Sequence, residues 1–337
     1  MLTDYQTILV CPLDWGLGHA SRCVPIIKKL TEEGKKVIVG ADKAPLSFLQ
    51  KEFPEIETIV VPGQPISYSA KGSSLKLFCE AVKFYRFIKK EHLLLDKIIE
   101  EKKIDCVVSD NRYGLYSKKI KSIIITHQIF PKTPVGEGYL TKKISKLLDK
   151  FNEVWVPDYE GEKNLSGELS HNKNKRPKNL KYIGPLSRFD RIDSSKIKEY
   201  KYDVCAIVSG PEPQRSIFEK EIEQAVINQK LRVVFFRGKP ESVRTAPHAN
   251  IKVFNHASTG EMQKTILQSK LIVCRSGYSS IMDLTLLSKN AILVATPGQY
   301  EQEYLANLHK NNPLFLIQKQ GALNIKKAIT NLTYNNL

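Results

Sequence analysis

Short apolar runs alternate along the chain with stretches in which apolar and polar residues recur at helical spacing. Each run ends in a polar or glycine-containing loop, which is typical of the buried strands of a parallel sheet. The runs that we interpret as strands are residues 7–10, 56–62, 104–109, 123–125, 153–157, 182–186, 204–208, 231–236, 251–254, 271–274, 291–295 and 314–317. The longest helical stretch covers residues 75–102. This alternation predicts an α/β protein built from βαβ units.

The pattern is interrupted near the middle of the chain and then starts again. Residues 161–181 are rich in Gly, Asn, Ser and Lys and show no periodicity, and a charged segment at 188–201 follows the next apolar run. A length of 337 residues also suits two domains. We therefore expect a first domain over residues 1–187, a second over 188–320 and a C-terminal tail over 321–337.

The segment 271–306 carries the clearest candidate chemistry. Its first strand leads into the small-residue loop 275–280 and then into a helical pattern that contains Asp283. A glycine turn at the start of a helix can bind a diphosphate, because free N–H groups and the positive end of the helix dipole face the anion. An acidic residue on that helix can reach a ribose diol. The alternative is a βα turn whose Ser and Gly only cap the helix.

A second glycine loop, DWGLGHASR, occupies residues 14–22 after the first strand. It lacks the Gly-Lys-Ser/Thr ending of a phosphate-binding P-loop and does not complete the dinucleotide fingerprint. His19 at the start of the following helix is a candidate general base, since the unperturbed pKa of histidine lies near working pH. Asp14 is a second candidate for the base, or for the group that orients His19. A capping or packing role for the histidine is the alternative.

Polar residues also follow other predicted strands, where ligands bind in open α/β sheets. Asp110 follows strand 104–109, and His127 and Gln128 follow strand 123–125. The second domain repeats this arrangement. Its candidates at strand ends are Ser209, Gly210, Arg215, Arg237 and Phe254, of which Arg215 could pair with a phosphate through two hydrogen bonds.

The net charge of +17 favours anionic partners: nucleic acid, an acidic membrane surface or phosphorylated ligands. No nucleic-acid-binding signature is present, so nucleic acid is not expected as a partner. Aromatic residues interleaved with lysine over residues 75–102 suit either a membrane-surface helix or a core helix with a basic solvated side. The six cysteines form no C-x-x-C pair and indicate small buried side chains. With no apolar run of bilayer length, we expect a cytoplasmic protein, in peripheral contact with the inner face of the membrane under the membrane-helix interpretation.

The order of the pieces in segment 271–306 resembles the donor-sugar motif of GT-B glycosyltransferases, most closely that of the family 28, MurG-like group. The shared pieces are Arg-Ser-Gly, an acidic residue six positions after that glycine, a strand that ends near Pro297, and then Gln302. Asp283 stands where this family usually has Glu, and Leu305 replaces the usual Asn. The loop at 14–22 is similar to the N-terminal loop of the same group, and also to that of the UDP-sugar hydrolase of pseudaminic acid synthesis.

The resemblance implies a GT-B fold, in which two Rossmann-like domains face a central cleft and a C-terminal helix packs back on the first domain. It implies His19, with Asp14, as catalytic residues, and an acceptor side formed by Asp110, His127 and Gln128. The donor-binding residues would be Gly18, Ser209, Gly210, Arg215, Arg237, Phe254, Ser276, Gly277, Tyr278, Ser279, Asp283 and Gln302. Chemistry with inversion and without a metal or other cofactor is expected, and the sequence contains no D-x-D arrangement for Mn²⁺ or Mg²⁺ beside these motifs.

The sequence therefore predicts a glycosyltransferase that moves a sugar from UDP-GlcNAc or a UDP-hexose to an acceptor, with a lipid-linked or membrane-linked glycan as the candidate acceptor. Two alternatives remain at this point. The first is a UDP-sugar hydrolase or epimerase on the same fold, and the second is a non-catalytic protein that binds nucleotide-sugars.

Overall fold

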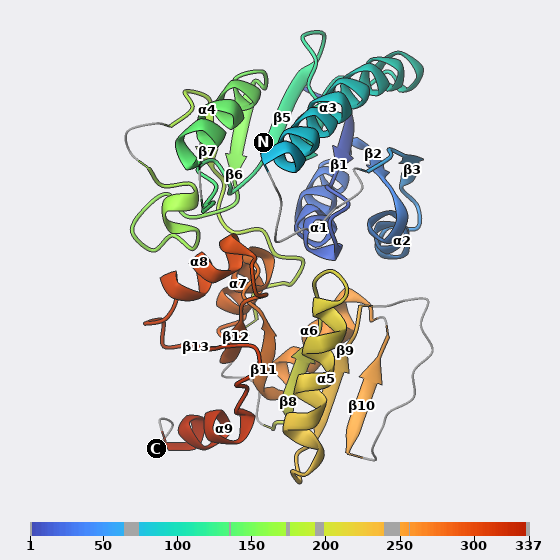
Figure 1. Ribbon diagram of the computed structural model, residues 1–337. Helices are drawn as coiled ribbons and strands as arrows, with labels where there is room; N and C mark the ends of the chain where they lie inside the picture. Colours follow the sequence, from blue (N-terminus) through green and yellow to red (C-terminus); the bar gives the residue numbers. More distant parts are fainter. Residues whose placement is uncertain are drawn as a thin grey trace. The chain divides into compact units, whose positions relative to one another are not determined.

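The chain divides into two compact units, Met1–Leu186 and Ser187–Leu337, each with its own parallel sheet. The computed structural model in Figure 1 describes residues 2–63, 74–134, 136–172, 176–192, 199–238, 250–255 and 257–334. The expected domain boundary, after residue 187, lies one residue from this division. The two units are described separately below.

The first unit is a seven-stranded sheet in the order β3-β2-β1-β4-β5-β6-β7. Its elements are β1 (Thr7–Cys11), α1 (Leu17–Glu32), β2 (Lys36–Ala41), α2 (Lys43–Glu52), β3 (Glu57–Val60), α3 (Ser74–Lys102), β4 (Cys106–Asp110), β5 (Lys121–Ile125), α4 (Glu137–Leu148), β6 (Glu153–Val156), the 3₁₀ turn η1 (Gly167–Leu169) and β7 (Leu180–Tyr182). All strand pairs in it are parallel.

Alternate residues of these strands point to opposite faces of the sheet, and each face has its own apolar core. Helices α1 and α2 pack on the face that carries Ile8, Val10 and Val108. Helices α3 and α4 pack on the other face, which carries Leu9 and Ile124. The strands are therefore buried on both sides, which is why they read as continuous apolar runs.

The second unit is a six-stranded sheet in the order β10-β9-β8-β11-β12-β13, again parallel throughout. Its elements are β8 (Tyr202–Ile207), α5 (Gln214–Ile227), β9 (Val233–Phe236), β10 (Ile251–Phe254), α6 (Thr259–Leu267), β11 (Ser269–Arg275), α7 (Tyr278–Leu286), β12 (Ala291–Val294), α8 (Tyr300–Leu308), β13 (Phe315–Gln318) and α9 (Ile325–Tyr334). The strand order reverses between β8 and β11, as it does between β1 and β4 in the first unit. Ligands of open α/β sheets bind at the carboxyl ends of strands beside such a reversal.

The predicted fold class, two Rossmann-like α/β domains, is confirmed, but two local expectations differ. The last strand of the first unit is Leu180–Tyr182 instead of 182–186. Arg275, expected in a loop, is the last residue of β11. Helix α9 buries Ile325 and Ala328 in the core of the second unit.

Among the helices in the described part of the chain, none combines the length and the apolar composition needed to cross a bilayer.

Candidate functional site

The first cluster lies at the carboxyl edge of the first sheet, where β1 and β4 are neighbours. His19 sits in the first turn of α1, and Asp110 is the last residue of β4. The Nδ1 atom of His19 lies 2.8 Å from Oδ1 of Asp110. The His19 side chain is 17% exposed, whereas Asp110 is fully buried. When Nδ1 donates its hydrogen to the carboxylate, Nε2 is left as the nitrogen that can take up a proton.

Arg22, one turn further along α1, completes this cluster. Its Nε and Nη2 donate to the two oxygens of Asp110. Its Nη1 lies 3.4 Å from Nδ1 of His127. The guanidinium is 2% exposed, so the paired charges are withdrawn from solvent. A two-point pair of this kind fixes the carboxylate plane, and with it the orientation of His19.

The charges in the cluster set the protonation states. Burial on its own would raise the pKa of Asp110, but Arg22 and His19 outweigh that effect and hold its pKa at about 2. Burial and the neighbouring Arg22 charge lower the pKa of His19, against the opposing pull of Asp110. His19 is therefore neutral near pH 7, which is the state that a general base needs.

The three residues expected on the acceptor side differ in their surroundings and exposure. Asp110 is enclosed by His19 and Arg22, so it supports the histidine and does not face a ligand. His127 is 3% exposed, beside Arg22. Gln128 is the partly exposed member, and its backbone N–H donates to the hydroxyl of Thr126 over 3.1 Å. Of the three, Gln128 is the one whose side chain reaches the surface of this unit.

Asp14 is not the residue that orients His19. Its carboxylate lies against Gly63, where an added Cβ would come within 1.7 Å of Oδ2. Burial raises the pKa of Asp14. In the described part of the chain no hydrogen bond joins Asp14 to His19. The orienting role that we considered for Asp14 is taken by Asp110.

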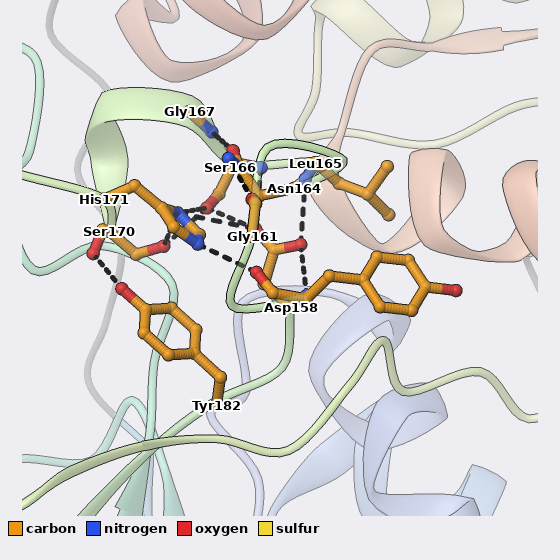
Figure 2. A network of polar contacts seen from close by, with 10 residues as sticks. Asp158, Gly161, Asn164, Leu165, Ser166, Gly167, Ser170, His171 and Tyr182 are labelled. Carbon is orange, nitrogen blue, oxygen red and sulfur yellow. Dashed lines mark hydrogen bonds and ion pairs between the residues drawn. The ribbon is translucent and has the colours of Figure 1, made fainter.

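A second polar network lies in the loop between β6 and β7 (Figure 2). The buried carboxylate of Asp158 accepts the backbone N–H groups of Tyr159 at 2.8 Å, Leu165 at 2.8 Å and Ser166 at 2.9 Å. It also accepts the hydroxyl of Ser166 at 2.6 Å. One side chain thus holds three backbone positions of the loop together.

His171 closes the same loop on its other side. Its Nδ1 lies 2.9 Å from the hydroxyl of Ser170, its Nε2 donates to the carbonyl of Tyr159 over 2.8 Å, and its ring stacks on Tyr182. The set contains Ser, His and Asp but cannot act as a nucleophilic triad, because the serines are fully buried and both histidine nitrogens are engaged. Its effect is to make the loop rigid.

This rigid loop also holds the end of β5. The carbonyl of Leu169 accepts the backbone N–H groups of Ile129 and Phe130, each at 2.9 Å. These residues come directly after His127 and Gln128. The sequence predicted only an irregular loop here, and the one signal in it was an aspartate directly after a strand.

In the second unit, the predicted diphosphate-binding loops meet at the carboxyl ends of β8 and β11. Ser209 and Gly210 follow β8 and are exposed, and Gly210 has a φ of +107°, a conformation that favours glycine. Gly277 caps α7, so Tyr278 and Ser279 lie in the first helical turn, at the positive end of the helix dipole. Tyr278 is 2% exposed, whereas Ser279 is partly exposed.

Two arginines that are predicted to bind the donor, Arg237 and Arg215, form contacts within the protein. Arg237 is buried and ion-paired with Glu219, and it also donates to Asn255 over 3.2 Å. Its guanidinium is therefore engaged within the unit, and its role in donor binding stays a prediction. Arg215 donates through Nη2 to the carbonyl of Arg237. Its buried Nε has no hydrogen-bond partner in the described part of the chain.

Other predicted donor residues are brought together. The hydroxyl of Ser276 donates to the backbone carbonyl of Gln302 over 2.8 Å, and the side-chain oxygen of Gln302 accepts the N–H of Thr296 over 2.9 Å. Phe254, at the end of β10, stacks on Phe236 with ring centroids 5.2 Å apart. Gly18 lies elsewhere, in the first unit beside His19.

Arg275 is a structural residue that the sequence did not reveal. Its guanidinium is buried and donates to the carbonyls of Ala295 and Gln214 and to the side chain of Gln320. It therefore ties the ends of β11, β12 and β13 to the start of α5. An arginine directly after an apolar run was the available signal.

Asp283 lies on α7 and is partly exposed. Its Oδ1 accepts the hydroxyl of Ser187 over 2.5 Å. Burial raises the pKa of Asp283 to about 6, although Arg188 and the Ser187 hydroxyl act against this. No cluster of three or more His, Cys, Asp or Glu side chains within the described ranges is arranged to hold a metal ion.

Comparisons with known proteins agree with this arrangement of two parallel sheets. Residues 214–335 match the glycosyltransferase family 28 C-terminal domain. An uncharacterized glycosyltransferase of Methanosarcina acetivorans is 27% identical over 313 residues, which cover 86% of this chain and 79% of the relative. The UDP-N-acetylglucosamine–N-acetylmuramyl-(pentapeptide) pyrophosphoryl-undecaprenol N-acetylglucosamine transferase of Caldanaerobacter subterraneus is 23% identical over 134 residues, which cover 40% of this chain and 29% of the relative.

Among solved structures, MurG of Acinetobacter baumannii has a TM-score of 0.56 at 14% identity, with coverage of 98% of this chain and 90% of that chain. Arabidopsis thaliana UGT89C1 in complex with quercetin has a TM-score of 0.61 at 12% identity and the same coverage. These two likenesses establish the fold, and the sequence matches establish the enzyme class. The chain is therefore a glycosyltransferase with the GT-B fold, and its residues 214–335 are similar to the family 28 C-terminal domain.

Proposed function

We propose that this enzyme transfers a sugar from a UDP-sugar, UDP-GlcNAc or a UDP-hexose, to an acceptor hydroxyl with inversion at the anomeric carbon. The observation that carries the proposal is the contact of His19 Nδ1 with the buried carboxylate of Asp110 and with Arg22 Nη2, each at 2.8 Å. In the tautomer that donates to Asp110, Nε2 of the neutral imidazole is the nitrogen that can accept a proton. The relative from Caldanaerobacter subterraneus, named for UDP-N-acetylglucosamine, supports the choice of donor.

In the proposed reaction, Nε2 of His19 accepts the proton of the acceptor hydroxyl as its oxygen attacks the anomeric carbon. The bond between that carbon and the diphosphate oxygen breaks, and UDP leaves with the electron pair. Asp110 stabilises the imidazolium that forms, because it stays ionised throughout. The first turn of α7 and the loop at Ser209 and Gly210 would stabilise the departing diphosphate.

The remaining donor contacts follow from the second unit. Asp283 would accept the ribose hydroxyls, Gln302 would contact the transferred sugar, and Phe254 would pack against the base. Arg215 would assist at the diphosphate through the donors that it does not use on Arg237. No metal or other cofactor takes part in this proposal, and activity is expected to survive EDTA.

A membrane-linked acceptor is supported by the basic outer sides of α3 and α4, which cover the same face of the first sheet (Figure 1). Tyr139 on α4 is 69% exposed, and Lys142 and Lys143 beside it are exposed. On α3, Tyr85 and Leu93 are 65% and 57% exposed. Exposed aromatic and basic side chains together suit an anionic lipid surface. We therefore place the enzyme in the cytoplasm, at the inner face of the membrane.

The experiment measures nucleotide release from a panel of UDP-, GDP- and dTDP-sugars, in water alone and with a membrane lipid extract. Release from a UDP-sugar only with the extract supports the transferase and identifies its donor. Free sugar formed at the same rate in water alone favours the hydrolase alternative, since the same histidine can activate water. Interconversion of the sugar without release favours an epimerase. His19→Ala should lower turnover about 10²- to 10⁴-fold, whereas His92→Ala, which changes a histidine on α3 outside the cluster, should leave turnover unchanged.

A further inference from the structure

The first residues of the second unit form a strap, residues 187–190, against α6 and α7. Asp190 donates its backbone N–H to Gln263 Oε1 over 3.4 Å, and Gln263 Nε2 donates back to the carbonyl of Asp190 over 2.6 Å. Phe189 is 4% exposed, and the guanidinium of Arg188 lies 5.0 Å from its ring centroid. These contacts fix the strap, and with it the position of Ser187.

The Ser187 hydroxyl has two partners with different roles. It accepts the backbone N–H of Phe189 over 3.1 Å and donates to Oδ1 of Asp283 over 2.5 Å. Because its lone pair faces an N–H group, its hydrogen is directed at the carboxylate. Of the described residues, none forms a hydrogen bond with the second oxygen, Oδ2. Asp283 therefore has one oxygen held by the strap and one left for a ligand.

We propose that Ser187 is a positioning residue of the donor site, which holds Asp283 so that its second oxygen faces a ribose hydroxyl. This rests on the proposed role of Asp283 in donor binding. A hydroxyl that donates to a carboxylate also favours the ionised form, which is the form that can accept from both ribose hydroxyls. The strap thus sets both the orientation and the charge of the carboxylate before the nucleotide arrives.

The role of Ser187 can be measured through the pKa of Asp283, which depends on the groups around it. Arg188 on the strap and the Cys274 thiol on β11 are its titratable neighbours in the described part of the unit. Burial raises the pKa of Asp283, while Arg188 and Ser187 lower it. Removal of the hydroxyl should raise this pKa further, so that Asp283 takes up its proton at a higher pH.

The test is isothermal titration calorimetry of UDP on the full chain across pH 5.5 to 8. Ser187→Ala should weaken UDP binding about 3- to 10-fold at pH 7, as expected for one lost hydrogen bond. It should also move the acid limb of the affinity profile to higher pH, and Ser187→Thr should restore both. The matched control is Ser269→Ala, which removes a hydroxyl that donates to the carbonyl of Thr265, outside the proposed donor site. It should leave the UDP profile unchanged.

The outcomes separate this inference from the function on which it rests. A Ser187→Ala profile identical to that of the wild type, while Asp283→Asn weakens UDP binding, overturns the role of Ser187 alone. Unchanged binding in Asp283→Asn overturns the ribose assignment and the inference with it. Failure of the wild-type chain to bind UDP, GDP or dTDP overturns the proposed function itself.

Discussion

Asp110 in the first unit and Asp283 in the second are carboxylates beside the strand reversals of two similar sheets, yet their surroundings differ. Asp110 is paired with a buried arginine and a histidine, and its pKa is held at about 2. Asp283 has a serine hydroxyl and a nearby arginine charge, and its pKa is raised to about 6. Asp110 is ionised over the whole working range of pH and orients another residue. Asp283 forms a hydrogen bond through only one of its two oxygens within the described part of the chain. This difference is expected if Asp110 orients a general base and Asp283 binds a ligand.

The largest effect is expected from removal of the base that Asp110 orients. His19→Ala should lower kcat about 10²- to 10⁴-fold, the range of general base catalysis, because the proposed acceptor of the hydroxyl proton is removed. The affinity of this variant for UDP, measured without acceptor, should stay within twofold of that of the wild type. Steady-state kinetics and calorimetry measure the two quantities. A weakened UDP affinity with normal kcat would move His19 to the donor site.

Removal of the carboxylate should damage the fold as well as the chemistry. Asp110→Ala leaves the buried Arg22 without its partner, which should cost about 3–5 kcal/mol of unfolding free energy. Asp110→Asn keeps the shape and part of the hydrogen bonding, so it should be the milder variant in urea unfolding. The contribution of Asp110 to stability exists above the unfolded-state pKa and is lost as pH falls through its folded pKa of about 2. Equal stability of Asp110→Ala and the wild type would contradict the account.

Replacement of the second carboxylate, Asp283, should stabilise the fold, in contrast to replacement of Asp110. Asp283→Asn should weaken UDP binding about tenfold, since one charge-assisted hydrogen bond to the ribose is lost. It should also raise Tm by about 2–4 °C, because the fold no longer contains a carboxylate whose charged form it disfavours. Differential scanning fluorimetry with and without UDP measures both effects. A lower Tm together with unchanged UDP binding would make Asp283 an ordinary structural residue.

The smallest expected effect is a pH dependence of thermal stability that is caused by Asp283. Its folded-state pKa is raised, so its proton stabilises the fold below the unfolded pKa, and this stability is lost as pH rises through about 6. The difference in Tm between Asp283→Asn and the wild type should therefore grow between pH 4.5 and 7. In Ser269→Ala, the matched hydroxyl variant, the difference should not change with pH.

Most of the fold could be predicted from the sequence, because each buried parallel strand is an apolar run with a turn after it. The errors fall where that signal fails. β7 carries only one aliphatic residue, Leu180, in its three positions, and β11 extends to the polar Arg275. The apolar face of α9, with Ile325 and Ala328, gave no information about which core it would join.

The candidate site was less predictable, because its contacts join distant parts of the chain. His19 was found by its loop, but the pairing of Arg22 with Asp110 spans 88 residues, and that of Asp283 with Ser187 spans 96. Asp14, close to His19 in sequence, was therefore considered ahead of Asp110. Arg237 is predicted as a donor-binding residue, and the sequence does not show that Glu219, on a different element, is its partner. Local sequence shows which groups stand at strand ends, and only the tertiary structure shows which of them are already paired.

The most direct test of the comparison is an NMR titration of the aspartate side-chain carboxyls, with Asp110→Asn and Asp283→Asn used to assign the two signals. The account predicts that Asp283 titrates near pH 6 in the free enzyme and at a lower pH when UDP is bound, while Asp110 stays ionised down to about pH 2 in both states. An Asp283 signal that titrates below pH 4 and does not respond to UDP would contradict the account.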